Sequence, residues 1–364
     1  MIKYLGSKRR LVAELGRLLD ATGARTTLDL FTGTTRVAQE FCRRGAWVTC
    51  VDTAAYSEVL AQCYVELDAA TVDPAEVAEA LARLAALPDR RGYVTEVFCE
   101  RSRYFHPDNG LRIDAIRDGI DELYGDSWLR PVLLTSLLEA ADRVDSTVGM
   151  QMAYLKQWAP RALRPLRLEV PVLTPGTGRA VRGDVLDVCP GLDAVDLAYL
   201  DPPYNQHRYF TNYHVWETLV RWDAPEHYGV ACKRADARDE ATRSPFNSRR
   251  TMPDALAGLI AGVRAETVVV SFSNEGFVPL AGLVEMCEQR GRPVRVLAYD
   301  TRRYIGQRLG VFNPAGQRVG VPGPERNTEY LLVSAPDEVL AAIALSAPPT
   351  DTSAVTGEAE VTGR

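Results

Sequence analysis

The residues best suited to chemistry are Asp201-Pro202-Pro203-Tyr204, which directly follow the apolar run LAYL. Such a run predicts a buried strand, so the four residues should lie at its carboxyl end, where open α/β sheets place their ligands. The two prolines stiffen the loop and remove two backbone donors. A carboxylate and a rigid carbonyl can then accept both hydrogens of an amino group, and Tyr204 offers a ring to a planar base. The simpler alternative is a chance strand-ending turn, since Asp and Pro are common in turns.

A second candidate site is the turn that runs from Asp29 to Thr35 with the sequence DLFTGTT. It combines an acid at a predicted strand end with Gly33, where backbone can approach a ligand, and it opens a predicted helix, as suits a nucleoside cofactor. Asp52 ends the next predicted strand, where a carboxylate accepts the two ribose hydroxyls of an adenosine cofactor. A lone strand-end Asp is more often a helix cap, so the pair is stronger evidence than either residue.

The elements that must position these residues follow from the periodicity of apolar residues. The pattern predicts a helix over 11–19, and then a strand at 27–31, a helix at 36–44 and a strand at 47–51. This βαβ unit implies parallel strands in a doubly wound sheet. Residues 57–158 show an almost wholly helical pattern, which predicts an inserted subdomain. Further strands are expected at 180–182, 197–200 and 267–272, with an antiparallel pair at 294–299 and 330–334.

The predicted fold class is therefore α/β, with a doubly wound Rossmann-like sheet, an inserted helical subdomain and a C-terminal β-hairpin. The expected domains are a sheet domain of residues 1–56 and 171–335, the helical subdomain 57–170, and a tail 336–364. The tail should be disordered from about residue 348, because it has almost no large apolar side chains.

Composition narrows the protein class. With 46% hydrophobic and 25% charged residues the chain is an ordinary globular protein, and no apolar run approaches the roughly 18 residues that span a bilayer. The N-terminus does not resemble a signal peptide. The seven cysteines form no CxxC pair, which favours reduced thiols in the cytoplasm over a disulfide framework or a zinc site.

A net charge of −6 argues mildly against a nucleic-acid partner, but basic residues cluster at 233–250 and 302–326. Such clusters are either a nucleic-acid surface or a solvated face.

Several motifs occur in the order typical of one enzyme family. The N-terminal YLGSK, the DLFTGTTR turn, Asp52 and the distant DPPY resemble the Dam-like (alpha-group) DNA adenine-N6 methyltransferases. The segments NQHRYFTNYHVWETL, SFSNEGF and NTEYLLVS extend this resemblance to about residues 1–335, and make it strongest to the FokI-type modification methyltransferases. The resemblance implies methyl transfer from S-adenosylmethionine, without a metal, to the N6 amine of adenine at specific sites in double-stranded DNA. It also implies a role in restriction-modification in the bacterial cytoplasm, on nucleoid DNA, with a cognate restriction endonuclease as candidate partner and no membrane.

The resemblance also assigns roles to matching positions. Catalytic roles fall to Asp201, Pro202, Pro203 and Tyr204. Cofactor binding is expected of Tyr4, Lys8, Asp29, Phe31, Gly33, Asp52, Asp184 and Asp201. Lys8 should lie near the methionine carboxylate and Asp184 near the cofactor adenine, although a simple turn Asp explains Asp184 almost as well. Thr35 stands where the family has its second loop glycine.

Contacts with DNA are expected of nine residues that are basic, or that follow the DPPY loop, where Arg208 mixed with aromatic rings suits phosphates and unstacked bases. They are Asn205, Arg208, Tyr209, Lys233, Arg234, Arg249, Arg250, Arg302 and Arg303. Base discrimination is expected from the helical subdomain, from the basic segment 233–250, or from both. His207 and His214 are candidates for substrate contact, although a lone histidine is more often a core or surface residue.

Two alternatives stay open at this point. The same loop chemistry serves methylation of another base amine, such as cytosine N4 or a base in RNA, although Asp201 as the first loop residue favours adenine. The second alternative is an inactive DNA-binding relative, against which the intact DPPY loop, Lys8 and Asp52 argue. A nicotinamide dehydrogenase is disfavoured because the sequence has no GxGxxG.

Overall fold

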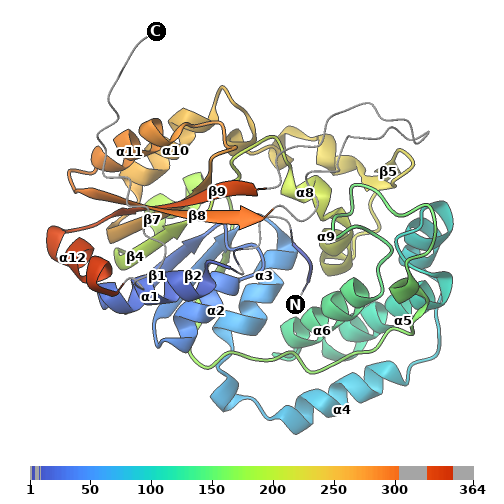
Figure 1. Cartoon of the computed structure of the whole chain (residues 1–364). Helices are drawn as coiled ribbons and strands as arrows, with labels where there is room; N and C mark the ends of the chain where they lie inside the picture. The colour runs from blue at the N-terminus through green and yellow to red at the C-terminus, as the bar shows by residue number, and fades with distance from the viewer. Residues whose placement is uncertain (1, 5–7, 9, 303–325, 347–364) are drawn as a thin grey trace. The chain divides into compact units, whose positions relative to one another are not determined.

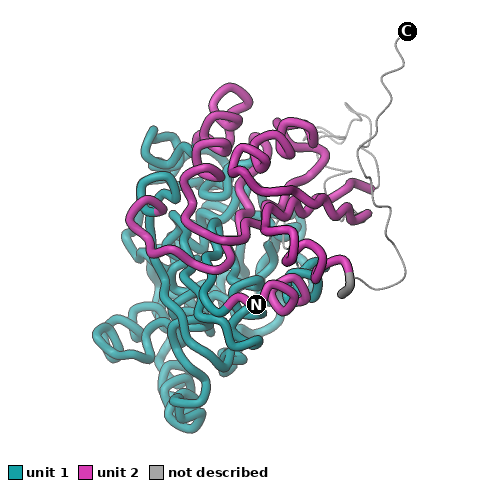
Figure 2. The backbone as a smooth tube through the Cα atoms, turned by 90° about the vertical axis from the view of Figure 1, so that its left-hand side faces the viewer, with its two compact units in different colours: residues 1–16, 25–188, 207–244 teal, residues 17–24, 189–206, 245–364 magenta. Residues whose placement is uncertain are grey.

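A computed structural model describes residues 2–4, 8, 10–302 and 326–346 of the chain. The expected disordered tail from residue 348, the residue Arg303 and most of the basic segment 302–326 lie outside the described residues. The chain divides into two compact units (Figure 2). Unit 1 comprises residues 1–16, 25–188 and 207–244, and unit 2 comprises residues 17–24, 189–206 and 245–364. Helix α1 (Val12–Thr22) contributes residues to both.

The sheet of unit 1 carries the predicted βαβ motif. Strand β1 (Thr26–Leu30), helix α2 (Arg36–Arg43) and strand β2 (Trp47–Asp52) follow one another, and β3 (Gly178–Arg182) comes later in the chain. The strands pair in the parallel order β3-β2-β1, and β1 and β2 are labelled in Figure 1. Both β1 and β2 are buried over most of their length because their side chains are apolar or small. The predicted parallel unit is confirmed, and Asp52 ends β2 as expected.

The helical region belongs to the same unit as this sheet. It contains α3 (Ala55–Ala61), α4 (Pro74–Ala85), α5 (Pro107–Tyr124) and α6 (Arg130–Arg143), with π-helices η1 (Gln62–Glu66) and η3 (Val94–Arg101) and the 3₁₀ turn η2 (Ala69–Thr71). Helix α6 packs against α3 and η1, so the division of the chain into compact units does not follow the subdomain boundaries expected from sequence.

The expectation of helix as far as residue 158 was wrong, because the helices end at Arg143. In the following segment Gly149 has a φ of 97°, which a right-handed helix does not allow. Tertiary ion pairs hold this segment instead. Asp145 is 2.8 Å from Lys3 Nζ and 2.7 Å from Arg161 Nη2.

The rest of unit 1 consists of one buried helix and several short elements. Helix α9 (His214–Arg221) is buried from His214 to Val220. The short elements are η4 (Pro160–Leu163), α7 (Val185–Val188), α8 (Tyr209–Asn212), η6 (Ala235–Arg238) and η7 (Glu240–Thr242). A two-residue antiparallel pair, β5 (His227–Tyr228) and β6 (Lys233–Arg234), was not predicted, since two residues are too short for a periodic signal.

Unit 2 contains a mixed sheet. Its strands are β4 (Val195–Leu200), β7 (Ala265–Ser273), β8 (Val294–Arg302) and β9 (Arg326–Ser334), in the order β4-β7-β9-β8. Strands β4 and β7 are parallel, and β9 is antiparallel to both β7 and β8, which confirms the predicted C-terminal pair. The other elements are η5 (Cys189–Gly191), η8 (Pro245–Asn247), α10 (Met252–Gly262), α11 (Leu280–Glu288) and α12 (Asp337–Ser346).

Both units combine strands with covering helices, so the predicted α/β class is confirmed. None of the described helices has the length and apolarity needed to cross a membrane. All seven cysteines are buried and free of disulfides. Among the residues with described positions, no three His, Cys, Asp or Glu side chains are grouped as a metal site requires.

Candidate functional site

The loop after β1 has an unusual backbone. Phe31, Gly33 and Thr35 have φ values of 68°, 53° and 60°, so three residues within one turn adopt the left-handed conformation. This costs of order 1–3 kcal/mol for a residue with a side chain, and such strain collects at binding sites. Thr35 therefore takes the conformation that a second glycine would favour. Its hydroxyl accepts a hydrogen bond from Gln39 Nε2 at 2.9 Å, and its side chain is buried.

Two carboxylates hold this loop. Asp29 is 1% exposed, and its Oδ2 accepts hydrogen bonds from Thr32 Oγ1 at 2.9 Å and from the Ala38 backbone N–H at 3.1 Å. Asp52 is only half-buried. Its Oδ2 accepts from the Gly33 N–H at 2.9 Å, and its Oδ1 accepts from the Ala54 N–H at 3.0 Å. The buried Asp29 thus stabilises the loop from the protein interior. Asp52 also bonds to the loop, but it is partly accessible to solvent.

Burial raises the pKa of the Asp52 carboxyl, and the backbone hydrogen bonds from Ala54 and Gly33 act in the opposite direction. The Thr53 N–H and the Ser57 hydroxyl also lower this pKa, so the carboxylate lies among several hydrogen-bond donors. Because Asp52 is only half-buried, its carboxylate is still partly accessible to a bound ligand.

Tyr4 lies over the same loop. A Cβ added to Gly33 would lie 3.0 Å from Tyr4 Cε1, so a side chain here would press on the ring, and the positive φ of Gly33 also favours glycine. The Tyr4 ring stacks on Tyr213 at 4.5 Å between centroids and on Tyr209 at 5.3 Å, and its hydroxyl is 3.3 Å from that of Tyr56. The structure thus brings together Tyr4, Gly33 and Asp52, three of the residues expected at the cofactor. Tyr209, expected on DNA, stacks here on Tyr4.

The remaining expected cofactor residues of unit 1 lie at helix starts. Lys8 is 8% exposed, and its carbonyl accepts from the N–H groups of Leu11 and Val12. Asp184 is half-buried, and its Oδ1 accepts from the Leu186 N–H at 2.9 Å, a local bond that agrees with the alternative interpretation of Asp184 as a simple turn residue. Tyr56, Tyr213 and Glu217 were missed, because nothing local in the sequence distinguishes them from core residues.

The DPPY loop lies in unit 2, at the carboxyl end of β4. Pro202 is buried, while Asp201, Pro203 and Tyr204 are half-exposed. The Tyr204 carbonyl accepts from the Phe277 N–H at 2.9 Å, and its ring lies 5.8 Å from that of Phe272. The next residue, Asn205, accepts from Asn247 Nδ2 at 2.9 Å through its carbonyl. The segment SFSNEGF, which carried part of the resemblance, therefore buttresses this loop.

The residues expected on DNA fall into different environments. Arg208, Arg249 and Arg250 are exposed, and the Arg249 guanidinium lies 5.5 Å from the Phe277 ring. Lys233 is half-buried, which lowers its pKa. Arg302 ends β8, where it pairs with Arg326 of β9, and Arg303 lies outside the described residues.

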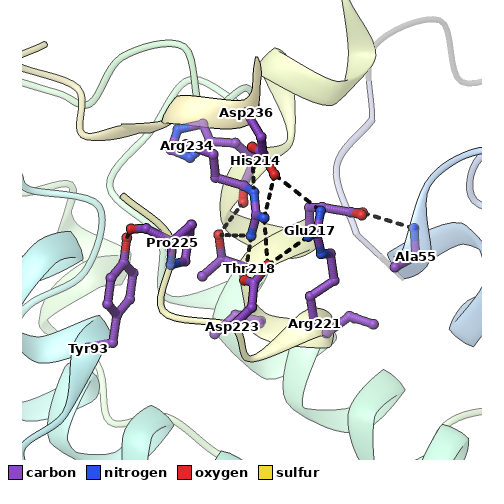
Figure 3. A network of polar contacts seen from close by, with 12 residues as sticks. Ala55, Tyr93, His214, Glu217, Thr218, Arg221, Asp223, Pro225, Arg234 and Asp236 are labelled. Carbon is purple, nitrogen blue, oxygen red and sulfur yellow. Dashed lines mark hydrogen bonds and ion pairs between the residues drawn. The ribbon is translucent and has the colours of Figure 1, made fainter. Parts of the chain in front are cut away.

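Arg234 differs from these residues because its side chain is 1% exposed. Its Nη1 and Nη2 donate to Asp223 Oδ1 and Oδ2 at 2.7 Å each, and its Nε donates to Asp236 Oδ1 at 3.0 Å (Figure 3). Its Nη1 also lies 3.3 Å from Thr218 Oγ1 in α9. A guanidinium held in this way is not presented to a phosphate, so its placement is at odds with the expected DNA contact.

His214 also lies in the core rather than on a substrate-facing surface. It is fully buried, and its Nε2 is 3.0 Å from the Gln151 carbonyl oxygen. A carbonyl only accepts, so Nε2 carries the ring proton. Burial lowers the pKa of His214 to about 3, with only partial opposition from the Gln151 hydrogen bond. The ring is therefore neutral at physiological pH and acts as a core donor.

This burial predicts a pH-dependent stability. The folded pKa lies below the unfolded value of about 6.5, so the unfolded chain binds the proton first as pH falls, and stability is lost from about pH 6.5 downward. Between pH 7 and pH 5 the wild type should lose about 2 kcal/mol of unfolding free energy more than His214→Gln. Urea unfolding of both proteins at the two pH values measures this difference. Equal losses would contradict a buried neutral His214.

Comparison with known proteins identifies the family. Residues 4–247 match the D12 class N6 adenine-specific DNA methyltransferase family. The Type II methyltransferase M.NlaIII of Neisseria lactamica is 29% identical over 306 residues, which cover 80% of this chain and 89% of that protein. M.FokI of Planomicrobium okeanokoites is 26% identical over 83% of this chain and 50% of its own length. M.CviAII of Paramecium bursaria Chlorella virus 1 is 28% identical over 61% of this chain and 67% of its own. The match spans both the Tyr4–Gly33–Asp52 cluster and the DPPY loop, and the chain therefore belongs to the D12 class of N6 adenine-specific DNA methyltransferases.

Proposed function

We propose that the chain is a modification methylase that uses S-adenosylmethionine to methylate adenine N6 at a specific sequence in double-stranded DNA. The observation that carries the proposal is the loop of residues 31–35. Its left-handed backbone places Gly33, which has no side chain, beneath Tyr4 and within hydrogen-bond distance of the half-buried Asp52 carboxylate. A bare backbone next to a strand-end carboxylate fits an adenosine-type cofactor.

The residues that would hold this cofactor are those of unit 1. Asp52 would accept its ribose hydroxyls, Gly33 would allow close approach, and Tyr4 would cover it. Lys8 and Asp184 are proposed at its carboxylate and its adenine, as the family pattern implies. When bound, S-adenosylmethionine supplies an electrophilic methyl group, and we propose that no metal takes part.

The DPPY loop would hold the adenine amine. Asp201 and the Pro202 carbonyl would accept its two hydrogens, which leaves the nitrogen lone pair free for methylation. Pro202 and Pro203 lack N–H groups, so the loop presents acceptors rather than donors to the amine. The hydrogen bond from Phe277 to the Tyr204 carbonyl fixes the loop, so that positioning can serve as the main catalytic device. The Tyr204 ring would stack on a base rotated out of the duplex.

DNA contacts are proposed for most of the basic and loop residues that the sequence analysis named. Arg249 is supported best, because it lies against Phe277, the residue whose backbone donates to Tyr204. Arg208, Arg250, Asn205 and Lys233 are proposed with it, as are Arg302, which ends β8, and Arg303. Base discrimination is proposed for the helical region 57–170 and the segment 233–250.

Mapping of modified bases tests the function. The chain is expressed in cells that lack adenine methylation, and long-read sequencing is expected to show N6-methyladenine at one short consensus. Mass spectrometry of the nucleosides separates this outcome from the alternatives. Detection of N4-methylcytosine in place of N6-methyladenine would overturn the assignment of adenine as the target base. Modification of RNA alone would overturn the assignment of DNA as the substrate.

The biological setting is proposed from the relatives, whose names identify them as Type II methyltransferases. We propose that the chain acts in the cytoplasm on nucleoid DNA and protects it from a cognate restriction endonuclease. DNA from the expressing cells is then expected to resist a nuclease that cuts the mapped consensus. Cleavage at fully methylated sites would contradict this role.

A further inference from the structure

We propose that Glu217 is a positioning residue for the cofactor, because it fixes the turn of residues 52–55 through the backbone of Ala55. The inference rests on the proposed function, since it concerns the turn from which Asp52 would bind the ribose. Glu217 belongs to α9, far along the chain from this turn, and it takes no part in the mechanism described above.

The start of α3 needs an acceptor that its own sequence does not provide. The first N–H groups of a helix have no partner within the helix, and a side-chain oxygen at the preceding position usually accepts one of them. Here the preceding residue is Ala54, which has no such oxygen. Glu217 supplies it instead, because its Oε2 accepts from the Ala55 N–H at 2.9 Å (Figure 3). Glu217 and Ala55 are 1% and 2% exposed, so water cannot replace the bond.

The turn is thus held at both ends by carboxylates. Asp52 accepts from Ala54 through Oδ1 and from Gly33 through Oδ2, and Glu217 accepts from Ala55. Without the Glu217 oxygen, the Ala55 N–H would be buried and unpaired, which a folded backbone avoids by shifting. A shift at Ala55 moves Ala54 and hence the Asp52 carboxylate. Since binding geometry tolerates little displacement, the affinity for the cofactor should fall.

Glu217 can act in this way because α9 is itself fixed. At its carboxyl end, the fully buried Arg117 of α5 donates from Nε to the Leu219 carbonyl at 2.6 Å and from Nη2 to the Val220 carbonyl at 3.0 Å. At its amino end, Gln151 Oε1 accepts from the Val215 N–H at 3.1 Å. A helix held at both ends presents the Glu217 carboxylate at a defined position.

The test compares substitutions that differ in the acceptor. Glu217→Met keeps the length of the side chain but removes the oxygen, and is expected to weaken S-adenosylmethionine binding about tenfold in calorimetry. Glu217→Gln keeps an acceptor oxygen and should stay within about threefold of the wild type. The KM for S-adenosylmethionine should rise in the same ratio, while kcat and the KM for DNA change little. Ala55→Pro removes the same bond from the donor side, at a helix position that accepts proline, and should also weaken binding.

A matched control separates positioning from stability. Asp114 of α5 is also a buried carboxylate that accepts backbone N–H groups, those of Gly92, Val94 and Thr95 in the helical region. Asp114→Asn should lower the Tm at least as far as Glu217→Met, yet leave S-adenosylmethionine affinity unchanged.

Two results would overturn the inference alone. One is that Glu217→Met and Ala55→Pro bind S-adenosylmethionine as tightly as the wild type does, while Asp52→Ala loses this binding. The other is an equal loss of affinity in Asp114→Asn, because stability would then explain the effect. Wild-type protein that does not bind S-adenosylmethionine would instead contradict the proposed function, and the inference with it.

Discussion

Asp201→Ala is expected to abolish adenine methylation, with kcat reduced by at least about 10³-fold, the scale on which preorganised polar groups act. Asp201 directly follows strand β4, whose last four residues are buried, and the loop that it opens is fixed by the bond between Tyr204 and Phe277. In the proposed mechanism, removal of the carboxylate would leave only the Pro202 carbonyl to orient the amine. Because both groups are proposed to act during the reaction, the loss should appear mainly in kcat and much less in the affinity for DNA. Incorporation of radiolabelled methyl groups into duplex DNA measures it.

The chain offers a control for this substitution. Asp193 precedes β4 at its amino end and is exposed. Asp193→Ala removes a carboxylate from the same region of sequence and should leave kcat within about twofold, as is usual for a surface substitution. Methylation by Asp201→Ala at the wild-type rate would refute the proposed catalytic loop, whatever the result for Asp193→Ala.

Much of the fold could be predicted because it rests on local patterns. Apolar runs that end in Asp or Gly placed β1, β2, β4 and β7 to within about two residues, the usual error at element boundaries. The antiparallel β8–β9 pair was predicted from two apolar segments alone. The end of the helical region was not, because Gly149 and the ion pairs of Asp145 determine the backbone there. A helical sequence pattern does not show where contacts with residues distant in the sequence determine the backbone conformation instead.

The candidate site shows the same division. Tyr4, Gly33 and Asp52 were recognised from motifs, and the structure brings them together. Glu217 could not be recognised, since its partner Ala55 lies 162 residues away and carries no side-chain signal. Contacts of this kind arise only after the chain has folded.

Predictions from charge alone were the weakest. The basic run that contains Arg234 also contains Asp236, and Asp223 lies a short distance before it. The sequence cannot show whether an arginine turns toward a phosphate or toward such neighbours. Tyr209 is similar, because an aromatic residue near the DPPY loop suits either an unstacked base or a stack of tyrosines.

Arg234→Met is expected to destabilise the protein by about 2–4 kcal/mol, close to the cost of breaking a buried ion pair. The guanidinium is 1% exposed, while its partners Asp223 and Asp236 are 30% and 27% exposed, so water can compensate part of the loss. Burial raises the pKa of Asp223, but the hydrogen bonds and charge of Arg234 outweigh this and hold it below its usual value. Urea unfolding measures the loss. Arg234→Lys should recover only part of it, since an ammonium cannot bridge both carboxylates in a bidentate manner.

Two further substitutions show whether Arg234 acts through the fold or through DNA. Arg238 is exposed and lies 3.7 Å over the Tyr228 ring, so Arg238→Met should cost at most about 1 kcal/mol. Arg249→Met should reduce the slope of log affinity for DNA against log salt by about one, as loss of one phosphate contact does. Arg234→Met should leave that slope unchanged in protein that is still folded, because its charge is already neutralised within unit 1. If Arg234→Met showed a reduced salt slope and wild-type stability, Arg234 would instead be a DNA-contacting residue. If Arg234→Met lost stability but kept the wild-type slope, the basic run 233–250 would have two roles. Arg234 would hold the segment in place, and the exposed cations of the segment would contact the phosphates.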